Sequence, residues 1–283
     1  MAEKDQNCSS ASTCGRDSCE GCPSKSGGVQ SFRVDQNPYS DIKHVIGVVS
    51  GKGGVGKSLV TAALANALVK AGASVGILDA DITGPSIPKM YGLTGPAGAL
   101  DENQILPEIT ENGIKVMSLN LIMEDPEQAV IWRGPIIAGV VKQFWTDVVW
   151  GELDYLLVDM PPGTGDVPLT VFQSLPVDGV FIVTSPQDLV RMIVAKAVNM
   201  TKMMDIPVLG VIENYSFLTC PDCGRKIEVF GKSRIEEIAK ETGIALAGQI
   251  PIDAEYAEKA DEGKFADVDI ACIGQAMNLL RGI

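Results

Sequence analysis

The stretch Ser50-Gly51-Lys52-Gly53-Gly54-Val55-Gly56-Lys57-Ser58 decides the fold. It contains the phosphate-loop pattern G-x-x-x-x-G-K-[ST], whose glycines let successive backbone N–H groups converge on phosphate oxygens. We expect Lys57 to reach the β- and γ-phosphates and Ser58 to place a hydroxyl on Mg²⁺. The pattern therefore predicts a Mg²⁺-ATP site, with contacts from Gly51, Lys52, Gly53, Gly54, Val55, Gly56, Lys57 and Ser58.

The flanking residues support this interpretation. Residues 44–50 form a short apolar run rich in β-branched side chains, which is typical of a buried strand. Residues 58–71 are rich in Ala and Leu, contain no Gly or Pro, and are followed by Gly72, as expected of a helix and its end. A strand, a glycine loop and a helix in this order place a phosphate at the helix N-terminus.

Lys52 is a second lysine that the phosphate-loop pattern does not require. Its place early in the loop is expected to direct it away from the nucleotide of its own chain. Such a lysine can serve the nucleotide of a neighbouring chain, so we expect Lys52 to act catalytically across a homodimer.

Strands and helices alternate from residue 44 onward. The expected strands after the first are residues 75–79, 114–119, 155–159, 179–184, 208–214 and 245–250, and further expected helices are residues 136–149, 189–204 and 233–241. This alternation predicts an α/β fold, a doubly wound and mostly parallel sheet with helices on both faces. Residues 41–283 are expected to form one ATPase domain, and residues 1–40, which lack apolar periodicity, a flexible cysteine-bearing arm.

Carboxylates stand at the ends of two expected strands, where ligands of such a sheet collect. Asp79 and Asp81 end one strand, so one can order Mg²⁺ while the other orients the attacking water; a helix cap or a turn is the alternative. Asp159 ends another strand and is the usual metal-side carboxylate of a phosphate-loop enzyme. In the loop after it, Gly163 is expected to offer its N–H to a γ-phosphate.

Cys220-Pro221-Asp222-Cys223-Gly224 is a turn that directs two sulfurs to one point. A soft-metal site needs about four thiolates, and no further cysteine lies nearby in the sequence. A two-fold axis beside the turn would complete the set from a second chain. A shared Zn²⁺ site and a redox Cys-x-x-Cys are the alternatives.

The arm contains four more cysteines, Cys8, Cys14, Cys19 and Cys22. They are sufficient for an iron–sulfur cluster within one chain, although an unstructured tail with incidental cysteines is also open. Cys272 lies in an apolar segment and is expected to be a core residue.

Composition excludes some classes of protein. The chain has 23 Lys and Arg against 36 Asp and Glu, a net charge of −13, which argues against a nucleic-acid binder. It has no apolar run of about 18 residues, so no membrane span is expected. The polar, cysteine-bearing start is unlike a signal peptide, so we expect a cytoplasmic protein with reduced thiols.

Together these residues resemble the Mrp/ApbC group of iron–sulfur carrier ATPases, cousins of the nitrogenase iron protein and of the MinD- and ParA-like ATPases. The resemblance runs from about residue 44 to the end of the chain. It rests on residues 51–58, 79–86, 132–135, 159–166, 213–216, 220–223 and 249–253.

The resemblance adds roles to individual residues. It implies that Asp81 orients the attacking water, which leaves Asp79 and Asp159 with Ser58 for Mg²⁺. It implies that Asn214, Pro251 and Asp253 bracket adenine. It also implies that Cys220 and Cys223 hold a [4Fe–4S] cluster between two subunits, and the arm resembles that of the eukaryotic cytosolic scaffold branch, which carries a second cluster.

The activity that this resemblance implies is a weak Mg²⁺-dependent ATPase. It would act as a homodimer that carries a cluster and hands it to apo iron–sulfur proteins. Two rivals are an ATPase that organises cell components on membrane or DNA, and a reductase that passes electrons to a partner.

Overall fold

The computed structural model describes residues 33–81, 84, 86–101, 104–123, 134–186 and 190–283. Cys8, Cys14, Cys19, Cys22, Trp132 and Arg133 lie outside these residues, so what was expected of them stays a prediction. The chain divides into Met1–Arg33 and the compact unit Val34–Ile283, and the account below concerns the second.

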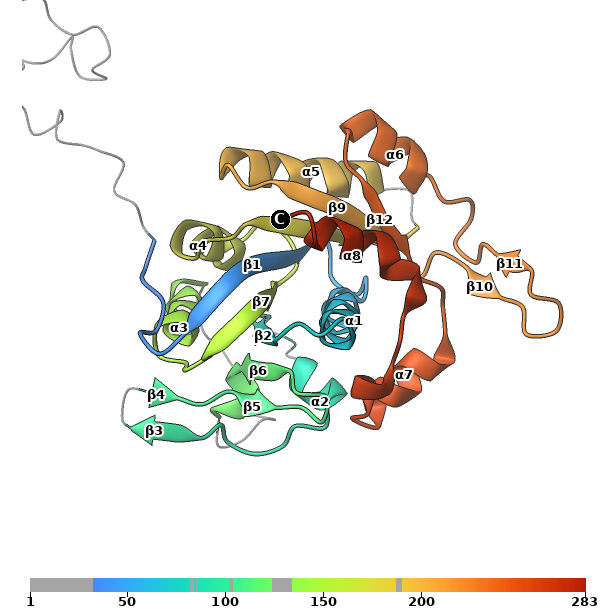
Figure 1. Cartoon of the computed structure of the whole chain (residues 1–283). Helices are drawn as coiled ribbons and strands as arrows, with labels where there is room; N and C mark the ends of the chain where they lie inside the picture. Colours follow the sequence, from blue (N-terminus) through green and yellow to red (C-terminus); the bar gives the residue numbers. More distant parts are fainter. Residues whose placement is uncertain (1–32, 82–83, 85, 102–103, 124–133, 187–189) are drawn as a thin grey trace, which may run out of the picture. The chain divides into compact units, whose positions relative to one another are not determined.

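The centre of this unit is an eight-stranded sheet of order β12-β9-β8-β1-β7-β2-β6-β5 (Figure 1). All neighbouring strands pair in parallel except β5 with β6. The strands are β1 (Asp41–Ser50), β2 (Val75–Asp79), β5 (Glu108–Ile109), β6 (Lys115–Ser118), β7 (Glu152–Asp159), β8 (Gly179–Thr184), β9 (Val208–Glu213) and β12 (Leu246–Gln249). The predicted parallel sheet and each predicted strand are thereby confirmed.

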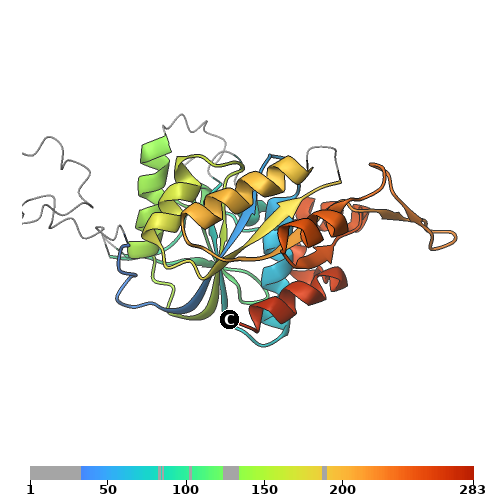
Figure 2. The same cartoon turned by 90° about the horizontal axis from the view of Figure 1, so that it is seen from above.

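Helices cover both faces of the sheet (Figure 2). They are α1 (Lys57–Lys70), α2 (Ile87–Met90), α3 (Gly134–Thr146), α4 (Asp166–Ser174), α5 (Val190–Met203), α6 (Ile235–Thr242), α7 (Ala254–Asp261) and α8 (Gly274–Leu280). One apolar cluster joins the sheet to α3, α4, α5 and α6, and a second joins it to α1, α2 and α8. Because strand side chains alternate between faces, neighbours such as Phe181 and Ile182 belong to different clusters.

Several short elements were not predicted. Two small hairpins, β3 (Ala99–Asp101) with β4 (Gln104–Ile105) and β10 (Leu218–Thr219) with β11 (Lys226–Ile227), are too short to show periodicity. Of the helices, α2, α4, α7 and α8 have four, nine, eight and seven residues, and such lengths give little helical pattern. No helix in the described ranges is long and apolar enough to cross a membrane.

The expectation that Cys272 is a core residue is wrong, because its side chain is exposed. Cys272 lies in a short 3₁₀-helix, η3 (Ala271–Ile273), which makes about three residues per turn. Ile270 and Ile273 therefore lie on one side and are buried, while Cys272 faces outward.

The last residues of the predicted arm contact the domain. The Val34 N–H donates to the Ser174 carbonyl at 3.0 Å, and the Val34 carbonyl accepts from Trp145 Nε1 at 3.0 Å. Asn37 is buried and donates from Nδ2 to the Thr146 carbonyl. Residues 34–40 thus belong to the compact unit.

Candidate nucleotide site and cysteine hairpin

The phosphate loop lies between the end of β1 and the start of α1. Gly54 and Gly56 both have φ of 76°, a left-handed conformation that favours glycine. A Cβ on Gly56 would lie 2.1 Å from Asn214 Nδ2, so packing as well as conformation requires glycine there. Gly56 is also the N-cap of α1 and carries no side chain to accept its first N–H groups, which leaves them to an anion.

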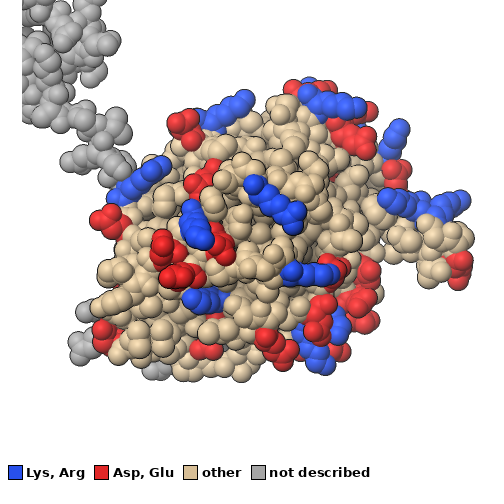
Figure 3. Space-filling view, viewed as in Figure 1, with Lys and Arg blue, Asp and Glu red and all other residues tan. Residues whose placement is uncertain are grey.

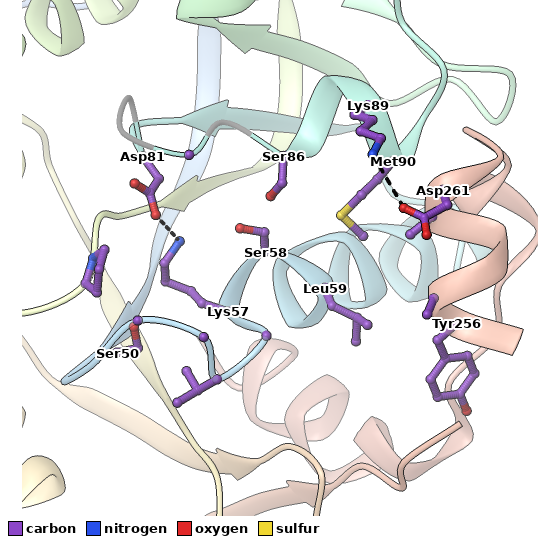
Figure 4. Close-up of a pocket in the computed structure, with 18 residues that line it drawn as sticks. Ser50, Lys57, Ser58, Leu59, Asp81, Ser86, Lys89, Met90, Tyr256 and Asp261 are labelled. Carbon is purple, nitrogen blue, oxygen red and sulfur yellow. Dashed lines mark hydrogen bonds and ion pairs between the residues drawn. The ribbon is translucent and has the colours of Figure 1, made fainter. Parts of the chain in front are cut away.

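The loop forms one wall of a pocket of about 410 Å³, and α2 and α7 form the opposite wall (Figure 4). Asp81 lines this pocket together with Gly53, Gly54, Val55, Gly56, Lys57 and Ser58, which are six of the eight phosphate-loop residues predicted to contact the nucleotide; Gly51 and Lys52 do not line it. Across the opening, Lys89 Nζ of α2 lies 3.5 Å from Asp261 Oδ1 of α7.

Lys57 is the charged centre of the site. Its Nζ lies 2.8 Å from Asp159 Oδ1 and 3.5 Å from Asp81 Oδ2, and only 6 % of the side chain is exposed. Burial lowers the pKa of Lys57, but the charges of Asp159 and Asp81 outweigh it, so the pKa is raised. An ammonium has three N–H donors, so the contacts with Asp159 and Asp81 leave Lys57 Nζ a donor for a phosphate oxygen.

Asp159 is fully buried and connects the loop helix to the sheet. Its Oδ2 accepts from Ser58 Oγ at 2.5 Å, and its Oδ1 accepts from Thr61 Oγ1 at 2.8 Å. A hydroxyl and a carboxylate side by side beneath a phosphate pocket suit Mg²⁺, which prefers oxygen ligands. The role of Ser58, Asp79 and Asp159 as Mg²⁺ ligands stays a prediction.

Asp79 lies beside Asp159, since the two residues are partners in the β2–β7 register. Burial and the neighbouring charge of Asp159 raise the pKa of Asp79 well above its usual value. Its Oδ1 accepts the Asp81 N–H at 3.1 Å and its Oδ2 accepts from Ser118 Oγ at 3.3 Å. The turn after β2 thus holds Asp79 inward and leaves Asp81 facing the pocket.

Other predicted residues lie around the pocket without lining it. The backbone N–H of Gly163, expected at a γ-phosphate, donates to the Ser50 carbonyl at 2.8 Å, while the adjacent Pro162 lines the pocket. Lys52 also lies outside the lining, and its carbonyl accepts from Ser50 Oγ. Their proposed roles toward phosphate stay predictions.

The residues expected at adenine have structural contacts of their own. Asn214 is 1 % exposed and donates from Nδ2 to the Val55 carbonyl of the phosphate loop at 3.0 Å. Asp253 is the N-cap of α7 and accepts the Glu255 N–H at 3.0 Å, and Pro251 lies just before it. Their roles toward adenine stay predictions as well.

The sequence analysis missed the far wall of the pocket. Tyr256, Ala257, Ala260 and Asp261 of α7 line it together with Lys89 and Met90 of α2. The available signal was Asp253 as a helix cap, followed by Tyr256 and Ala260 at a helical spacing of four.

Cys220 and Cys223 lie in a second region, the cysteine hairpin, defined as residues 218–227 (β10, the turn and β11). It projects from the body of the domain in both ribbon views (Figures 1 and 2). The turn is closed by the Cys220 N–H donating to the Arg225 carbonyl and the Gly224 N–H donating to the Cys220 carbonyl. The backbone N–H groups of Cys223 and Asp222, with the Cys223 side chain, lower the pKa of the Cys220 thiol.

The hairpin and the residues after it are open to solvent. Residues 221–230 are all exposed, among them the apolar side chains Ile227, Val229 and Phe230. Basic side chains project from this part of the molecule (Figure 3). Among the described residues no group of three or more His, Cys, Asp or Glu side chains is placed to hold a metal ion.

Known proteins similar to this chain identify its family. The family model described as ParA, NUBPL iron-transfer P-loop NTPase, matches residues 41–278. An iron–sulfur cluster carrier protein of Methanocaldococcus jannaschii is 47% identical over 260 residues, 87% of each chain. A solved nucleotide-binding protein of Archaeoglobus fulgidus, in complex with ADP, is 43% identical with a TM-score of 0.72, over 80% of this chain and 88% of that one.

The cell-division ATPase MinD of Pyrococcus furiosus shares the fold, with a TM-score of 0.57 at 22% identity over 84% of this chain and 95% of that one. The predicted MinD- and ParA-like fold class and the family resemblance are both confirmed. The chain therefore belongs to the ParA family of NUBPL-type iron-transfer P-loop NTPases.

Proposed function

We propose that this protein is an ATP-dependent iron–sulfur cluster carrier. Two chains would hold one [4Fe–4S] cluster between them and transfer it to apo-proteins. The cluster is the cargo of the reaction, and ATP binding and slow hydrolysis would close and reopen the dimer around it. The curated name of the M. jannaschii relative and the ADP complex of the A. fulgidus protein support this proposal.

The observation that carries the proposal is the pair formed by the half-buried Cys220 and the exposed Cys223, at the turn of a projecting hairpin. A cysteine that serves the core would be buried, whereas these two are placed where another molecule can reach them. Two thiolates are half of what the cluster takes, and a second copy of the same turn supplies the rest. Exposure also suits a cluster that must leave.

ATP would be bound and hydrolysed at the end of the pocket that contains Lys57 and Asp81. Lys57 would hold phosphate oxygens with the N–H groups of the glycine loop, and Asp81 would accept a hydrogen bond from the attacking water. Ser58, Asp159 and Asp79 would hold Mg²⁺, which neutralises phosphate charge when bound.

Lys52 would complete the site of the partner chain, as a lysine that stabilises phosphate charge in trans. A mixed dimer tests this role, with Lys52→Ala in one chain and Lys57→Ala in the other. Its one intact phosphate loop faces a chain that still has Lys52, so hydrolysis should return at that site. A verified mixed dimer without activity would count against the role in trans.

Iron content after anaerobic reconstitution tests the cluster proposal. The double variant Cys220→Ser/Cys223→Ser should contain about two iron atoms per chain fewer than the parent, since a shared cluster has four per dimer. It should still bind ATP and should transfer no cluster to an apo-acceptor. Cys272→Ser is the matched control, because Cys272 is exposed but lies in η3. Equal iron in the double variant and the control would show that Cys220 and Cys223 do not bind the cluster. Zinc in place of iron at these cysteines would show that an iron–sulfur cluster is not the cargo.

A further inference from the structure

Residues 213–216 connect the phosphate loop to the cysteine hairpin. This segment begins with the last residue of β9 and ends two residues before β10. Its two middle residues contact the loop: Asn214 Nδ2 donates to the Val55 carbonyl at 3.0 Å, and a Cβ on Gly56 would lie 3.0 Å from the Tyr215 hydroxyl. A displacement of the loop at Val55 or Gly56 therefore meets this segment directly.

The outer residues of the segment, Glu213 and Ser216, bond to each other and to residues that flank the hairpin. Glu213 is 1 % exposed, and its carboxylate accepts from Ser216 Oγ at 2.6 Å and from Ser233 Oγ at 2.8 Å. Gln249 Nε2 of β12 donates to the same carboxylate at 3.1 Å. Ser216 precedes the hairpin and Ser233 follows it, so the buried Glu213 carboxylate holds the chain both where it enters the hairpin and after it leaves.

The backbone conformation of Tyr215 allows the middle residues of the segment to contact the phosphate loop while Glu213 and Ser216 bond to each other. Its φ is 58°, a left-handed conformation that is unusual for a residue other than glycine. The resulting turn brings Ser216 back to Glu213 while Asn214 and Tyr215 face the phosphate loop. A strained backbone conformation of this kind persists only where surrounding contacts hold it. Here those contacts are with the phosphate loop on one side and with the Glu213 carboxylate on the other.

The position of the hairpin depends on its base, the residues just before and after it. Backbone hydrogen bonds hold the residues before it, from the Ser216 N–H to the Ile250 carbonyl and from the Ile252 N–H to the Phe217 carbonyl. At this base, a cleft of about 490 Å³ is lined by Ser216, Ser233 and Gln249, by Lys226 of the hairpin and by Glu236 and Glu237 of α6. The open space beside Lys226 leaves the hairpin room to move, so a small change where it joins the domain can alter the direction of the cysteines.

We infer that Glu213 is a positioning residue for the cysteine hairpin, and that residues 213–216 transmit the nucleotide state of the phosphate loop to Cys220 and Cys223. This inference rests on the proposed function, since it concerns how ATP would control the cysteine site. The two oxygens of a carboxyl group accept several hydrogen bonds at once, so this one side chain can hold residues on both sides of the hairpin.

Hydrogen–deuterium exchange of the full-length, reduced, metal-free protein tests the inference. In the parent, a saturating non-hydrolysable Mg²⁺-ATP analogue should change exchange in residues 217–232 by about threefold or more, as local stability there shifts. Ser216→Ala and Ser233→Ala each remove one hydroxyl from Glu213, and each should reduce that change by at least about half. Nucleotide affinity should stay within about twofold, since neither serine contacts the loop.

Two controls separate coupling from general loss of stability. Ser233→Thr retains the hydroxyl and should retain the nucleotide-dependent change. Ser40→Ala removes a buried serine hydroxyl that bonds to Val148 and Trp150, remote from the hairpin, and should also retain it. The readout is the difference with and without nucleotide, so fraying of α6 where Ser233 Oγ accepts the Ile235 N–H does not contribute to it.

The inference is overturned if saturating nucleotide leaves exchange of residues 217–232 in the parent unchanged. It is also overturned if either Ser216→Ala or Ser233→Ala retains the full change, since both legs are required. The cysteines carry no iron in this exchange experiment. Failure of Cys220 and Cys223 to bind iron in the separate reconstitution experiment would therefore refute the proposed function and leave the exchange result standing.

Discussion

The phosphate loop and the cysteine hairpin both follow strands of the same sheet, but their surroundings are opposite. The loop follows β1, which pairs on both sides, and its charged residues Lys57 and Asp159 are buried. The hairpin consists of two-residue strands whose turn and following residues are exposed. Lys57 and Asp159 meet within one chain, whereas under the proposed function the two cysteines of the projecting hairpin would be half of a ligand set that a second chain completes.

The largest expected effect concerns the buried lysine of the loop. Lys57→Ala should reduce ATP hydrolysis at least about 100-fold, because phosphoryl transfer depends on positioned positive charge. Phosphate release is the measurement. Lys70→Ala, in the same helix but exposed and paired with Asp269, is the matched control and should keep the parent rate. Hydrolysis by Lys57→Ala at the parent rate would show that the buried lysine of the phosphate loop is not required for catalysis.

Two glycines provide a sharper comparison of the regions. Gly56 and Gly224 have φ of 76° and 69°, but a Cβ on Gly56 would meet Asn214 at 2.1 Å, while one on Gly224 meets nothing within 4 Å. Gly56→Ala should cost roughly 3 kcal/mol or more of unfolding free energy and weaken nucleotide binding, because strain and a clash add. Gly224→Ala should cost about 1 kcal/mol from backbone strain alone.

Urea unfolding and nucleotide titration of both glycine variants measure this difference. Equal losses would mean that the loop is no more tightly constrained than the hairpin. Retention of full nucleotide affinity by Gly56→Ala would contradict the contact between Asn214 and the loop.

The same contrast explains what could be predicted from the sequence. The parallel strands and the loop are local patterns, and the placing of Asp79 beside Asp159 follows from parallel strands ending at one edge. The wall of α2 and α7 could not be predicted, because Lys89 and Asp261 are 172 residues apart and meet only through the tertiary fold.

Residues with more than one available partner were also difficult to assign. The family resemblance implies that Asn214 contacts adenine, which stays a prediction, and in the structure its amide donates to the Val55 carbonyl. The Gly163 N–H likewise has a carbonyl partner in Ser50. A sequence shows which groups can donate a hydrogen bond. Which acceptor each donor finds depends on tertiary packing, which brings together residues that are far apart in the sequence.

A smaller effect is expected from the pH dependence of the buried site. The pKa of Asp79 is raised on folding, so the folded chain holds a proton that the unfolded chain loses, and stability falls as pH rises from about 4 toward the raised pKa. Asp79→Asn cannot ionise. Without Mg²⁺ or nucleotide, it should therefore gain roughly 1 kcal/mol or more relative to the parent between about pH 4 and pH 8.

Asp154→Asn is the control of opposite sign. Hydrogen bonds from Lys43 and Ser74 lower the pKa of Asp154 to about 2, so its contribution is present above the unfolded pKa and is lost as pH falls through the folded one. Its removal should lower stability at neutral pH, and by a modest amount because the side chain is partly exposed. Urea unfolding at several pH values measures both variants; a parallel pH dependence of parent and Asp79→Asn would contradict the raised pKa.

The smallest effect concerns the cysteine hairpin, where the shift has the opposite direction. Backbone N–H groups of Cys223 and Asp222 lower the pKa of the Cys220 thiol, so its thiolate persists to lower pH. Alkylation by iodoacetamide, followed by peptide mass spectrometry on metal-free protein, should give a midpoint for Cys220 below about pH 8.5, the usual value for cysteine. Asp222→Ala retains the backbone donor and should retain the shift, whereas loss of the shift would assign it to the Asp222 side chain. The thiolate is the form that binds a soft metal, so the lowered pKa of Cys220 would prepare this half of the proposed site for its cargo before the partner chain arrives.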